Sequence, residues 1–307
     1  MCYRCRENAY SYREPSVQKF GISTALVTPF TDAGGLDIET LRGHIRSVLA
    51  LGADGVTLFG TTGEGASVSD TEVSATLKAL TPQDIGRNQI TLAIYATSVG
   101  SGIAQIQNAA NHGVTRILLP PPFYFKDVGD DAVFEWYDAV LAGCPVGTQV
   151  ILYHIPQITM VSLSLNLIQR LHSVHPAKVF AVKDSAGAWE DTKALLDHSG
   201  VAVLVGDERQ LAAAAKLGCA GSISGLANVY PDRLKEILKT AEPDPALDTL
   251  INAVVANPVT AAVKFVVSEH HGNPAWRRVR APLTATPDTA FAAIRLAYAA
   301  MPTPAGG

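Results

Sequence analysis

The stretch KVFAVKDSAGAWEDTKALLDHSGVAVLVG, residues 178–206, holds the pattern on which the predicted fold rests. Two apolar runs rich in valine, 178–183 and 201–206, have the length and composition of buried strands. Residues 188–197 between them have the spacing of a helix. Strands this apolar are covered on both faces, as in parallel sheets whose connections are helices. The stretch therefore predicts one strand–helix–strand unit of a parallel sheet.

The same alternation continues along most of the chain. Strand-like runs alternate with segments of helical spacing, and the helix-capping residues Asp37, Ser69 and Ser162 precede three of these segments. Eight such units over about 200 residues match a closed (β/α)8 TIM barrel better than an open doubly wound sheet, which usually stops at about five or six strands. The predicted strands are 23–29, 55–59, 90–96, 115–120, 149–154, 178–183, 201–206 and 221–225. The predicted helices are 37–50, 69–80, 101–111, 130–142, 162–173, 188–197 and 208–217.

The two ends of the chain differ from this pattern. Residues 1–20 are polar and aperiodic and are expected to form a loose extension. The barrel is then expected over 21–230, and residues 231–307 form a helical C-terminal extension. Helical spacing in that extension recurs at 232–240, 245–255, 259–270 and 288–300.

Composition excludes several classes of protein. Hydrophobic residues make up 48% of the 307 residues and charged residues 17%, which is enough for a large buried core. A net charge of −4 without a basic block gives nucleic acid nothing to bind. No apolar run is long enough to span a membrane and no signal peptide is recognisable, so neither nucleic acid nor a membrane is an expected partner and a cytoplasmic location is expected.

The cysteines indicate neither a disulfide framework nor a metal site. Cys2, Cys5, Cys144 and Cys219 are too few and too scattered for a secreted disulfide scaffold, and reduced thiols are expected. Cys2 and Cys5 form a Cys-x-x-Cys pair, but no second pair or histidine stands at zinc spacing. No metal site is therefore expected.

Chemistry in a barrel belongs at the carboxyl ends of the strands, where the following loops build the active face. Polar or small residues follow most of the predicted strands at this point. They are Thr61, Thr62 and Glu64 in GTTGEG (60–65), Tyr124 in PPPFYF (120–125), Tyr153, Lys183, the run Gly206-Asp207-Glu208, and Ser222-Ile223-Ser224.

Lys183 stands at the end of a buried strand and is the first candidate for catalysis. An apolar wall removes hydration from an ammonium group, which lowers its pKa and frees the neutral amine that attacks a carbonyl carbon. The alternative is a lysine that extends to the rim or pairs with Asp184. A phenol at Tyr153 and hydroxyls at Thr61 and Thr62 would add a proton carrier and a cradle for a small anion. Imine chemistry on a 2-keto acid requires these parts.

Four motifs in this order resemble the dihydrodipicolinate synthase and N-acetylneuraminate lyase family of class I pyruvate-dependent aldolases. They are GTTGEG (60–65), LYHIP (152–156), VKDSAG (182–187) and GCAGSISGLAN (218–228). The resemblance extends from about residue 21 to about residue 282. It implies a TIM barrel, pyruvate as one substrate, an aldehyde or keto sugar acid as the other, and a homotetramer built from two dimers. It implies no metal and no cofactor, because the imine on the lysine activates the pyruvate methyl group.

The resemblance also implies roles for individual residues. Lys183 is expected to form the Schiff base with pyruvate, and Tyr153 to carry protons. Thr61 and Thr62 are expected to hold the pyruvate carboxylate, with Thr62 also bonded to the tyrosine. Tyr124 corresponds to a tyrosine that many members supply across a subunit interface. Gly206 and Ile223 match positions that line the pyruvate site.

The sequence departs from the synthases after the tyrosine. It reads Tyr-His-Ile-Pro-Gln-Ile-Thr over 153–159, and Ile158 occupies the position of the arginine that binds the second substrate's carboxylate in synthases. N-acetylneuraminate lyases and keto-deoxy-sugar-acid aldolases carry an apolar or small residue there. Asp207 and Glu208 match an acidic pair that accepts hydrogen bonds from a polyhydroxylated chain in sialic acid lyases. Glu208 has the alternative role of opening a helix, and synthases also carry an acidic residue at this point.

These observations predict a lyase that cleaves or builds a 2-keto-3-deoxy sugar acid through pyruvate on Lys183. The alternatives are a dihydrodipicolinate synthase that condenses pyruvate with aspartate semialdehyde, a keto-sugar-acid dehydratase, and a non-catalytic keto-acid sensor. A phosphate cradle at GCAGSISG is a further possibility in a barrel. The adjacent Asp207 and Glu208 argue against it, because carboxylates repel phosphate.

Overall fold

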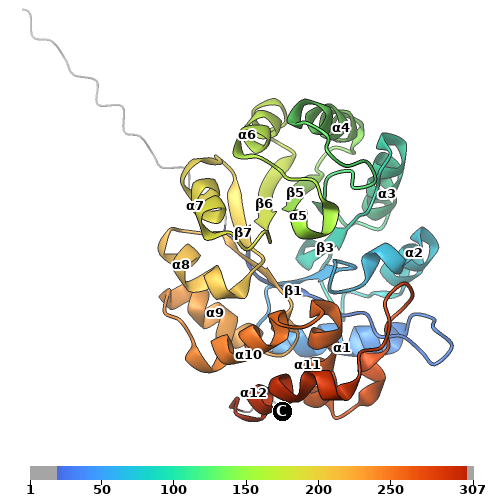
Figure 1. The fold of residues 1–307 in the computed structure, drawn as a ribbon. Helices are drawn as coiled ribbons and strands as arrows, with labels where there is room; N and C mark the ends of the chain where they lie inside the picture. Colours follow the sequence, from blue (N-terminus) through green and yellow to red (C-terminus); the bar gives the residue numbers. More distant parts are fainter. Residues whose placement is uncertain (1–18, 303–307) are drawn as a thin grey trace, which may run out of the picture.

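The computed structural model describes residues 19–302 as a closed barrel of eight parallel strands surrounded by helices, which confirms the predicted TIM barrel (Figure 1). Each strand pairs with the next, and β8 pairs with β1 to close the sheet. Cys2, Cys5 and most of the predicted extension 1–20 lie outside the described residues. The strands are β1 Gly21–Ala25, β2 Gly55–Leu58, β3 Ile90–Ala93, β4 Arg116–Leu119, β5 Gln149–His154, β6 Val179–Asp184, β7 Ala202–Val205 and β8 Gly221–Ser224.

The first strand differs from its prediction at both ends. It begins at Gly21, where φ is +80° and an added Cβ would lie 2.3 Å from the Asp54 carboxylate. It ends at Ala25: the Leu26 N–H still donates to the Thr57 carbonyl of β2, but the Val27 N–H donates to the side chain of Asn228. The first half of the predicted strand 23–29 is therefore confirmed, whereas residues 26–29 are buried without belonging to the strand.

The helices around the barrel form where caps and spacing predict them. Asp37 and Ser69 cap the first two helices with their side chains. The cap of α6 is Ser164, whose hydroxyl accepts from the Leu167 N–H, so the prediction of Ser162 was wrong. The short helix α5 after β5 shifts the start of α6 towards the C-terminus. The helices are α1 Ile38–Ala50, α2 Asp70–Ala79, α3 Val99–Asn111, α4 Asp130–Gly143, α5 Pro156–Thr159, α6 Leu165–Val174, α7 Trp189–His198 and α8 Leu211–Lys216.

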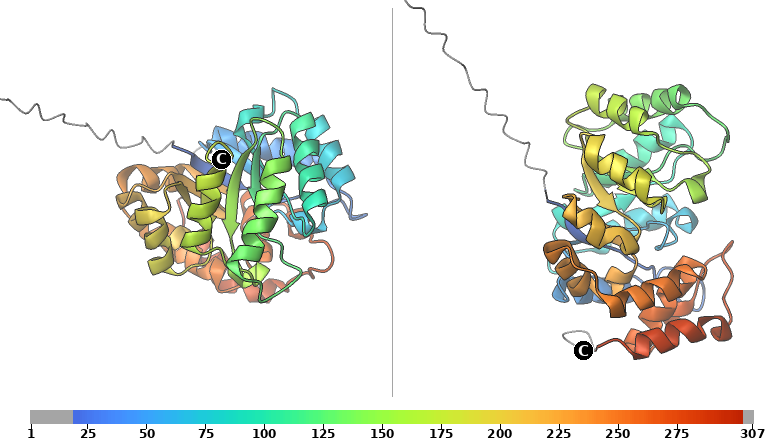
Figure 2. Two further views of the ribbon diagram at one scale, coloured as in Figure 1. Left: turned by 90° about the horizontal axis from the view of Figure 1, so that it is seen from above. Right: turned by 60° about the vertical axis from the view of Figure 1, so that its left-hand side comes forward.

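Helices follow the last strand and pack on one side of the barrel (Figures 1 and 2). The first of them, α9 Pro231–Thr240, contacts β1 and α8 and so lies in the ring of helices around the barrel. The others pack against one another through a separate apolar cluster that includes Leu250, Val266 and Phe291. They are α10 Pro245–Val255, α11 Val259–His271 and α12 Ala292–Ala299. Within residues 19–302, no helix is both long and apolar enough to cross a membrane.

The interior of the barrel is a core of its own. Leu118, Ile151 and Leu204 are fully buried there, and burying such a side chain stabilises the fold by about 1.5–3 kcal/mol. The strands also place the small residue Ala25 inside. Ala25 lies at the carboxyl end of β1 and lines a cavity that opens there.

Candidate active site

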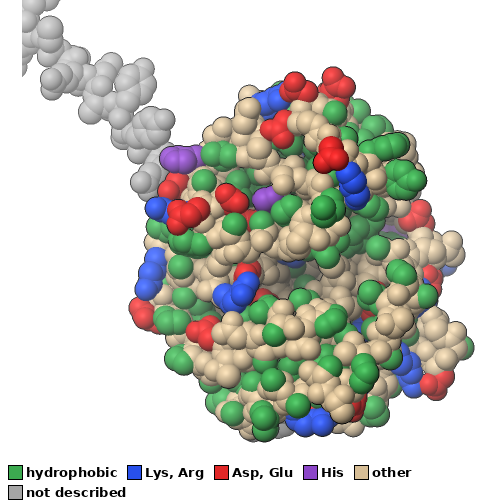
Figure 3. Space-filling view, viewed as in Figure 1, with side chains coloured by type: hydrophobic (Ala, Val, Ile, Leu, Met, Phe, Trp, Pro, Cys, Tyr) green, Lys and Arg blue, Asp and Glu red, His purple; other side chains and the backbone are tan. Residues whose placement is uncertain are grey.

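A cavity of about 290 Å³ lies at the carboxyl ends of the strands. Figure 3 shows this face of the molecule hollowed near its centre, with charged side chains of both signs at the edge of the hollow. The structure brings most of the predicted site residues to this cavity. They are Thr61, Thr62, Tyr153, Ile158, Lys183, Gly206, Asp207, Glu208 and Ile223.

Lys183 and Tyr153 form the centre of the site. The two residues are directly paired on the neighbouring strands β5 and β6. Lys183 is only 6% exposed, and its Nζ donates a hydrogen bond of 3.2 Å to the Tyr153 hydroxyl. The same Nζ lies 4.3 Å from the centre of the tyrosine ring. An amine and a phenol thus meet at the floor of the cavity.

Lys183 does not pair with Asp184, because successive side chains of a strand point to opposite faces. The Asp184 carboxylate instead contacts His154 at 3.1 Å and accepts from the Thr192 hydroxyl at 2.6 Å. Burial alone would raise the pKa of Asp184, but the hydrogen bonds from His154, Thr192 and the Ala186 N–H lower it. This buried network fixes the strand end from the outer side and leaves the lysine facing the cavity.

The loop between β2 and α2, residues 59–69, supplies Thr61 and Thr62 and is called the threonine loop below. The Thr61 hydroxyl lies 3.4 Å from the Tyr153 hydroxyl, whereas Thr62 lies on the side of Gly225. The prediction that Thr62 contacts the tyrosine was therefore wrong. The backbone of Phe59, with φ of 55°, turns the chain sharply out of β2. The sequence alone does not give that turn, which decides which threonine faces Tyr153.

A buried ion pair anchors the threonine loop to the C-terminal helices. The Glu64 carboxylate pairs with Lys264 of α11, and both side chains are completely buried. Glu64 also accepts a hydrogen bond of 2.8 Å from the Arg280 N–H. Burial lowers the pKa of Lys264 although Glu64 opposes the shift. Lys264 was not among the predicted site residues. The sequence does contain a signal for it, because it is a lysine within the largely apolar run 259–267.

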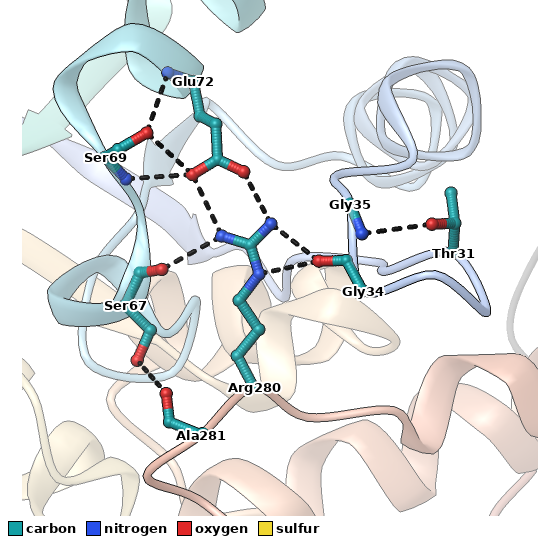
Figure 4. A network of polar contacts seen from close by, with 8 residues as sticks. All are labelled: Thr31, Gly34, Gly35, Ser67, Ser69, Glu72, Arg280 and Ala281. Atoms are coloured by element: carbon teal, nitrogen blue, oxygen red, sulfur yellow. Dashed lines mark hydrogen bonds and ion pairs between the residues drawn. The ribbon is translucent and has the colours of Figure 1, made fainter.

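Arg280 ties the same loop to the C-terminal segment (Figure 4). Its guanidinium donates to both oxygens of Glu72, at 2.5 and 3.0 Å, and to the carbonyls of Ser67 and Gly34. The hydrogen bond from Arg280 lowers the pKa of Glu72 to about 2. The anchors of the threonine loop therefore come from residues that lie 200 or more positions later in the sequence.

Gly206 leaves no room for a side chain. A Cβ there would lie 1.9 Å from the Ser185 hydroxyl and 2.9 Å from the Asp184 carbonyl. The glycine thus lets β7 end close against the loop that follows Lys183.

The acidic pair after β7 already has partners within the chain. Asp207 contacts Arg209 with a shortest distance of 2.6 Å. Glu208 accepts from the Ser224 hydroxyl at 2.6 Å and from the Leu226 N–H at 3.3 Å. Both carboxylates line the cavity, but neither is without a hydrogen-bond donor. Glu208 is therefore more than the first residue of a helical turn, because it joins the ends of β7 and β8.

The rim of the cavity carries an isoleucine and an arginine. Ile158 is 60% exposed on α5. Arg209, which sequence reasoning did not single out, lines the same cavity and lies near Gly187, where an added Cβ would be 3.9 Å from Nη2. Lys183 and Arg209 are the basic residues that line this cavity.

Tyr124 is not part of the cavity in a single chain. It is 73% exposed, and its ring packs edge-on against Phe125. A second, more apolar cavity of about 610 Å³ lies on the other side of Thr61, and Tyr95, Ile158 and Pro282 are among the residues that line it. Sequence reasoning did not identify Tyr95, which sits just beyond the end of β3.

Two other predictions concern ligands. The hydroxyls of GCAGSISG serve the fold, because Ser222 donates to the Val205 carbonyl and Ser224 to Glu208. They are therefore not free to form a phosphate cradle. In the part of the chain between residues 19 and 302, no three histidine, cysteine or acidic side chains gather as a metal site would require.

Comparison with known proteins adds to this geometry. The model of the dihydrodipicolinate synthetase family matches residues 18–295. An uncharacterized DapA-like lyase of Chloroflexus aurantiacus is 32% identical over 278 residues, which is 90% of each chain. A 4-hydroxy-tetrahydrodipicolinate synthase of Cytophaga hutchinsonii is 29% identical and covers 72% of this chain and 74% of its own.

Solved structures are similar to the whole barrel. A dihydrodipicolinate synthase from Agrobacterium tumefaciens superposes with a TM-score of 0.88 and 40% identity, covering 92% of this chain and 99% of its own. CdNal from Clostridium difficile, solved with mannosamine, gives a TM-score of 0.77 at 21% identity over 91% of this chain and 98% of its own. At that identity the second likeness concerns the fold alone.

Proposed function

Because the chain belongs to the dihydrodipicolinate synthetase family of class I Schiff-base lyases, we propose that it cleaves or forms a 2-keto-3-deoxy sugar acid through an imine on Lys183. The observation that carries the proposal is the buried Lys183 amine, 3.2 Å from the Tyr153 hydroxyl, in a cavity whose rim has Ile158 at the position of the synthase arginine. The family acts on pyruvate and an aldehyde, and the proposal concerns which aldehyde.

The first step would be imine formation. The Lys183 amine, after losing a proton, attacks the C2 carbonyl of the keto acid and forms a carbinolamine. The Tyr153 phenol gives its proton to the carbinolamine oxygen, which leaves as water. Thr61 and Thr62 would hold the keto acid's carboxylate with hydroxyl and N–H groups, while Gly206 and Ile223 line the space around it.

The second step would break the carbon–carbon bond. The Tyr153 phenolate takes the proton of the C4 hydroxyl, the C3–C4 bond breaks, and its electron pair passes to the imine nitrogen through C3 and C2. The aldehyde leaves and an enamine remains on Lys183. Protonation of the enamine at C3 and hydrolysis of the imine release pyruvate and restore the amine.

The side chains at the rim favour a substrate whose chain beyond C3 is uncharged and carries hydroxyl groups. Ile158 cannot bind a carboxylate, and each charged hydrogen bond that a carboxylate would lose there is worth about 1.5–3 kcal/mol. Asp207 and Glu208 each keep lone pairs beyond those used by Arg209 and Ser224, so they can accept from substrate hydroxyls. A cavity of about 290 Å³ suits a small substrate.

A synthase that condenses pyruvate with aspartate semialdehyde is the second candidate. Arg209 favours it, because this guanidinium lies on the same rim and offers a carboxylate a charged donor. Curated relatives named as 4-hydroxy-tetrahydrodipicolinate synthases support the same choice. A dehydratase would use the same imine but release water and not an aldehyde.

Borohydride trapping tests the imine. With pyruvate, reduction should add the mass of the pyruvyl group to Lys183, and Lys183→Ala should abolish the adduct. No adduct on the wild-type chain would refute the proposal and leave a keto-acid sensor. A panel of keto sugar acids, assayed by pyruvate release, then identifies the substrate. Turnover of aspartate semialdehyde would favour the synthase, and loss of the sugar acid without pyruvate would favour the dehydratase.

Assembly is part of the proposal. Tyr124 can act only if a second copy of the chain brings it to the site, as in a homotetramer built from two dimers. Sedimentation of the protein, together with the kinetics of Tyr124→Phe, tests both points. A monomer with full activity would exclude this role for Tyr124.

A further inference from the structure

A side-chain amide bridges the seam of the barrel where β8 meets β1. The backbone ladder between these strands ends at Thr24 and Ser224. The next carbonyl on each strand, that of Ala25 and that of Gly225, accepts a hydrogen bond from Nδ2 of Asn228, at 2.9 and 2.7 Å. Both residues line the catalytic cavity. The Asn228 amide thus continues the seam at the point where the strands stop pairing.

His44 of α1 binds the oxygen of the same amide. The Oδ1 atom of Asn228 accepts from the Val27 N–H at 3.1 Å and lies 2.9 Å from Nε2 of His44. Because an amide oxygen can only accept, Nε2 carries the proton of the neutral imidazole and Nδ1 is an acceptor. The partner of Nδ1 is Nε2 of His271 in α11, at 3.2 Å. His44 and Asn228 are 2% and 1% exposed, so water does not compete for these bonds.

Acid opposes this arrangement, because a proton on Nδ1 of His44 would face the N–H of His271. Burial lowers the pKa of His44 to about 3, and the hydrogen bond with Asn228 opposes the shift. His271 and His270 of α11 lower the pKa further, and among residues 19–302 they are the titratable groups that face His44. Trp276, whose ring centre lies 4.9 Å from that of His44, is uncharged. His44 therefore contributes stability that is complete above about pH 6.5 and is lost as the pH falls towards 3.

The seam bears on the catalytic cavity through Gly225. A Cβ added to this glycine would lie 3.9 Å from both Cγ2 and Oγ1 of Thr62, so its backbone packs against a threonine that is expected to hold the carboxylate of the keto acid. We propose that His44 and Asn228 are positioning residues for keto-acid binding, because they fix Gly225 and thereby the place of Thr62. This inference rests on the proposed imine chemistry. Neither residue lines the cavity, so their effect should fall on the affinity for the keto acid and not on the chemistry at Lys183.

Two substitutions of His44 test the hydrogen bond, with borohydride trapping of pyruvate as the assay. His44→Leu removes the donor to Asn228, so the pyruvate concentration for half-maximal trapping should rise about tenfold while the maximal trapping rate changes less than about twofold. His44→Gln places an amide N–H near the position of Nε2 and should restore the wild-type concentration dependence to within about twofold. His172→Gln is the matched control, because His172 is half-buried and contacts the Val179 carbonyl at the start of β6, away from the carboxyl ends of the strands.

The pH dependence of unfolding gives a second measurement. From about pH 8 to about pH 5, the unfolding equilibrium constant of the wild type should rise about 30-fold more than that of His44→Gln, because the unfolded chain binds a proton that the buried imidazole does not. The same rise in both proteins would show that His44 takes up its proton in the fold, and would overturn the assigned direction of the hydrogen bonds.

A double-mutant cycle tests whether His44 and Asn228 act as one unit. In the Asn228→Ala background, His44→Leu should change the half-saturating pyruvate concentration by less than about twofold. The two His44 variants decide the question even if Asn228→Ala does not fold. If the wild type traps pyruvate and His44→Leu keeps its concentration dependence, or if His44→Gln does not restore it, the inference is wrong. No adduct on the wild-type chain would instead refute the proposed function, and with it keto-acid binding as the task of this seam.

Discussion

Removal of the Lys264 ammonium should be among the most destabilising single changes in this chain. In Lys264→Met the Glu64 carboxylate stays completely buried, and among residues 19–302 only the Arg280 N–H remains as a charge-stabilising donor. Loss of one partner from a buried ion pair costs about 3–5 kcal/mol, which is a large fraction of the roughly 5–15 kcal/mol that stabilises a typical folded domain. The double variant Lys264→Met with Glu64→Gln should recover at least about 2 kcal/mol, because the unpaired charge is gone.

Urea unfolding of the two single variants, the double variant and the wild type measures this coupling, provided that the m value stays constant. Lys239→Met is the control, since Lys239 is 74% exposed and its contact with Glu236 is worth at most about 0.5 kcal/mol. A cost below about 1 kcal/mol for Lys264→Met would refute the reasoning, because it would mean that Glu64 is neutral or hydrated in the folded protein. Looser pyruvate binding should accompany the loss of stability, since Glu64 belongs to the threonine loop.

Three further predictions concern the rim, the strand end and the C-terminal anchor. Arg280 lowers the pKa of Glu72 to about 2, so the contribution of Glu72 to stability is complete above about pH 4.5 and is lost as the pH falls towards 2. In Glu72→Gln the free energy of unfolding should lack this part of its pH dependence. The same loss of stability between pH 4.5 and 2 in the variant and the wild type would contradict the prediction. Ile158→Arg should lower KM for an aldehyde that carries a carboxylate by about tenfold, with unfolding unchanged within about 0.5 kcal/mol because the site is 60% exposed. Gly206→Ala should cost about 1–3 kcal/mol in thermal or urea unfolding and reduce pyruvate trapping, since the new Cβ would lie 1.9 Å from the Ser185 hydroxyl; wild-type stability would show that the strand end adjusts freely.

Residue types and their order along the chain were enough to predict the barrel and the meeting of Lys183 with Tyr153 at its mouth. Lys183 and Tyr153 each end a strand, and the closed parallel sheet pairs those ends directly. The geometry of the turn after β2 could not be predicted from the sequence in the same way. The threonine that meets the tyrosine is Thr61 and not Thr62, because the left-handed backbone at Phe59 sets how the loop leaves its strand.

Side-chain contacts account for the other differences, one of them local and one between distant segments. Asp207 looked like a free acceptor in the sequence, but its partner Arg209 is fixed by the local turn after β7. Lys264 was visible only as a charge within an apolar helix, and the structure is needed to see that Glu64 meets it. The sequence contains the two charges, but 200 residues separate them and nothing local predicts their meeting.

The anchoring of the threonine loop also sets when the site can form during synthesis. Arg280 lies 216 positions after Glu64, a distance that a ribosome covers in about 10–45 s at 5–20 residues per second. Until then the threonine loop has strands around it, but Glu64 lacks the Lys264 ammonium and the Arg280 N–H that bind its carboxylate. A chain that stops before α11 would thus resemble a barrel and yet bind its keto acid poorly. Pyruvate binding is therefore a property of the completed chain, and it would distinguish full-length protein from prematurely terminated products.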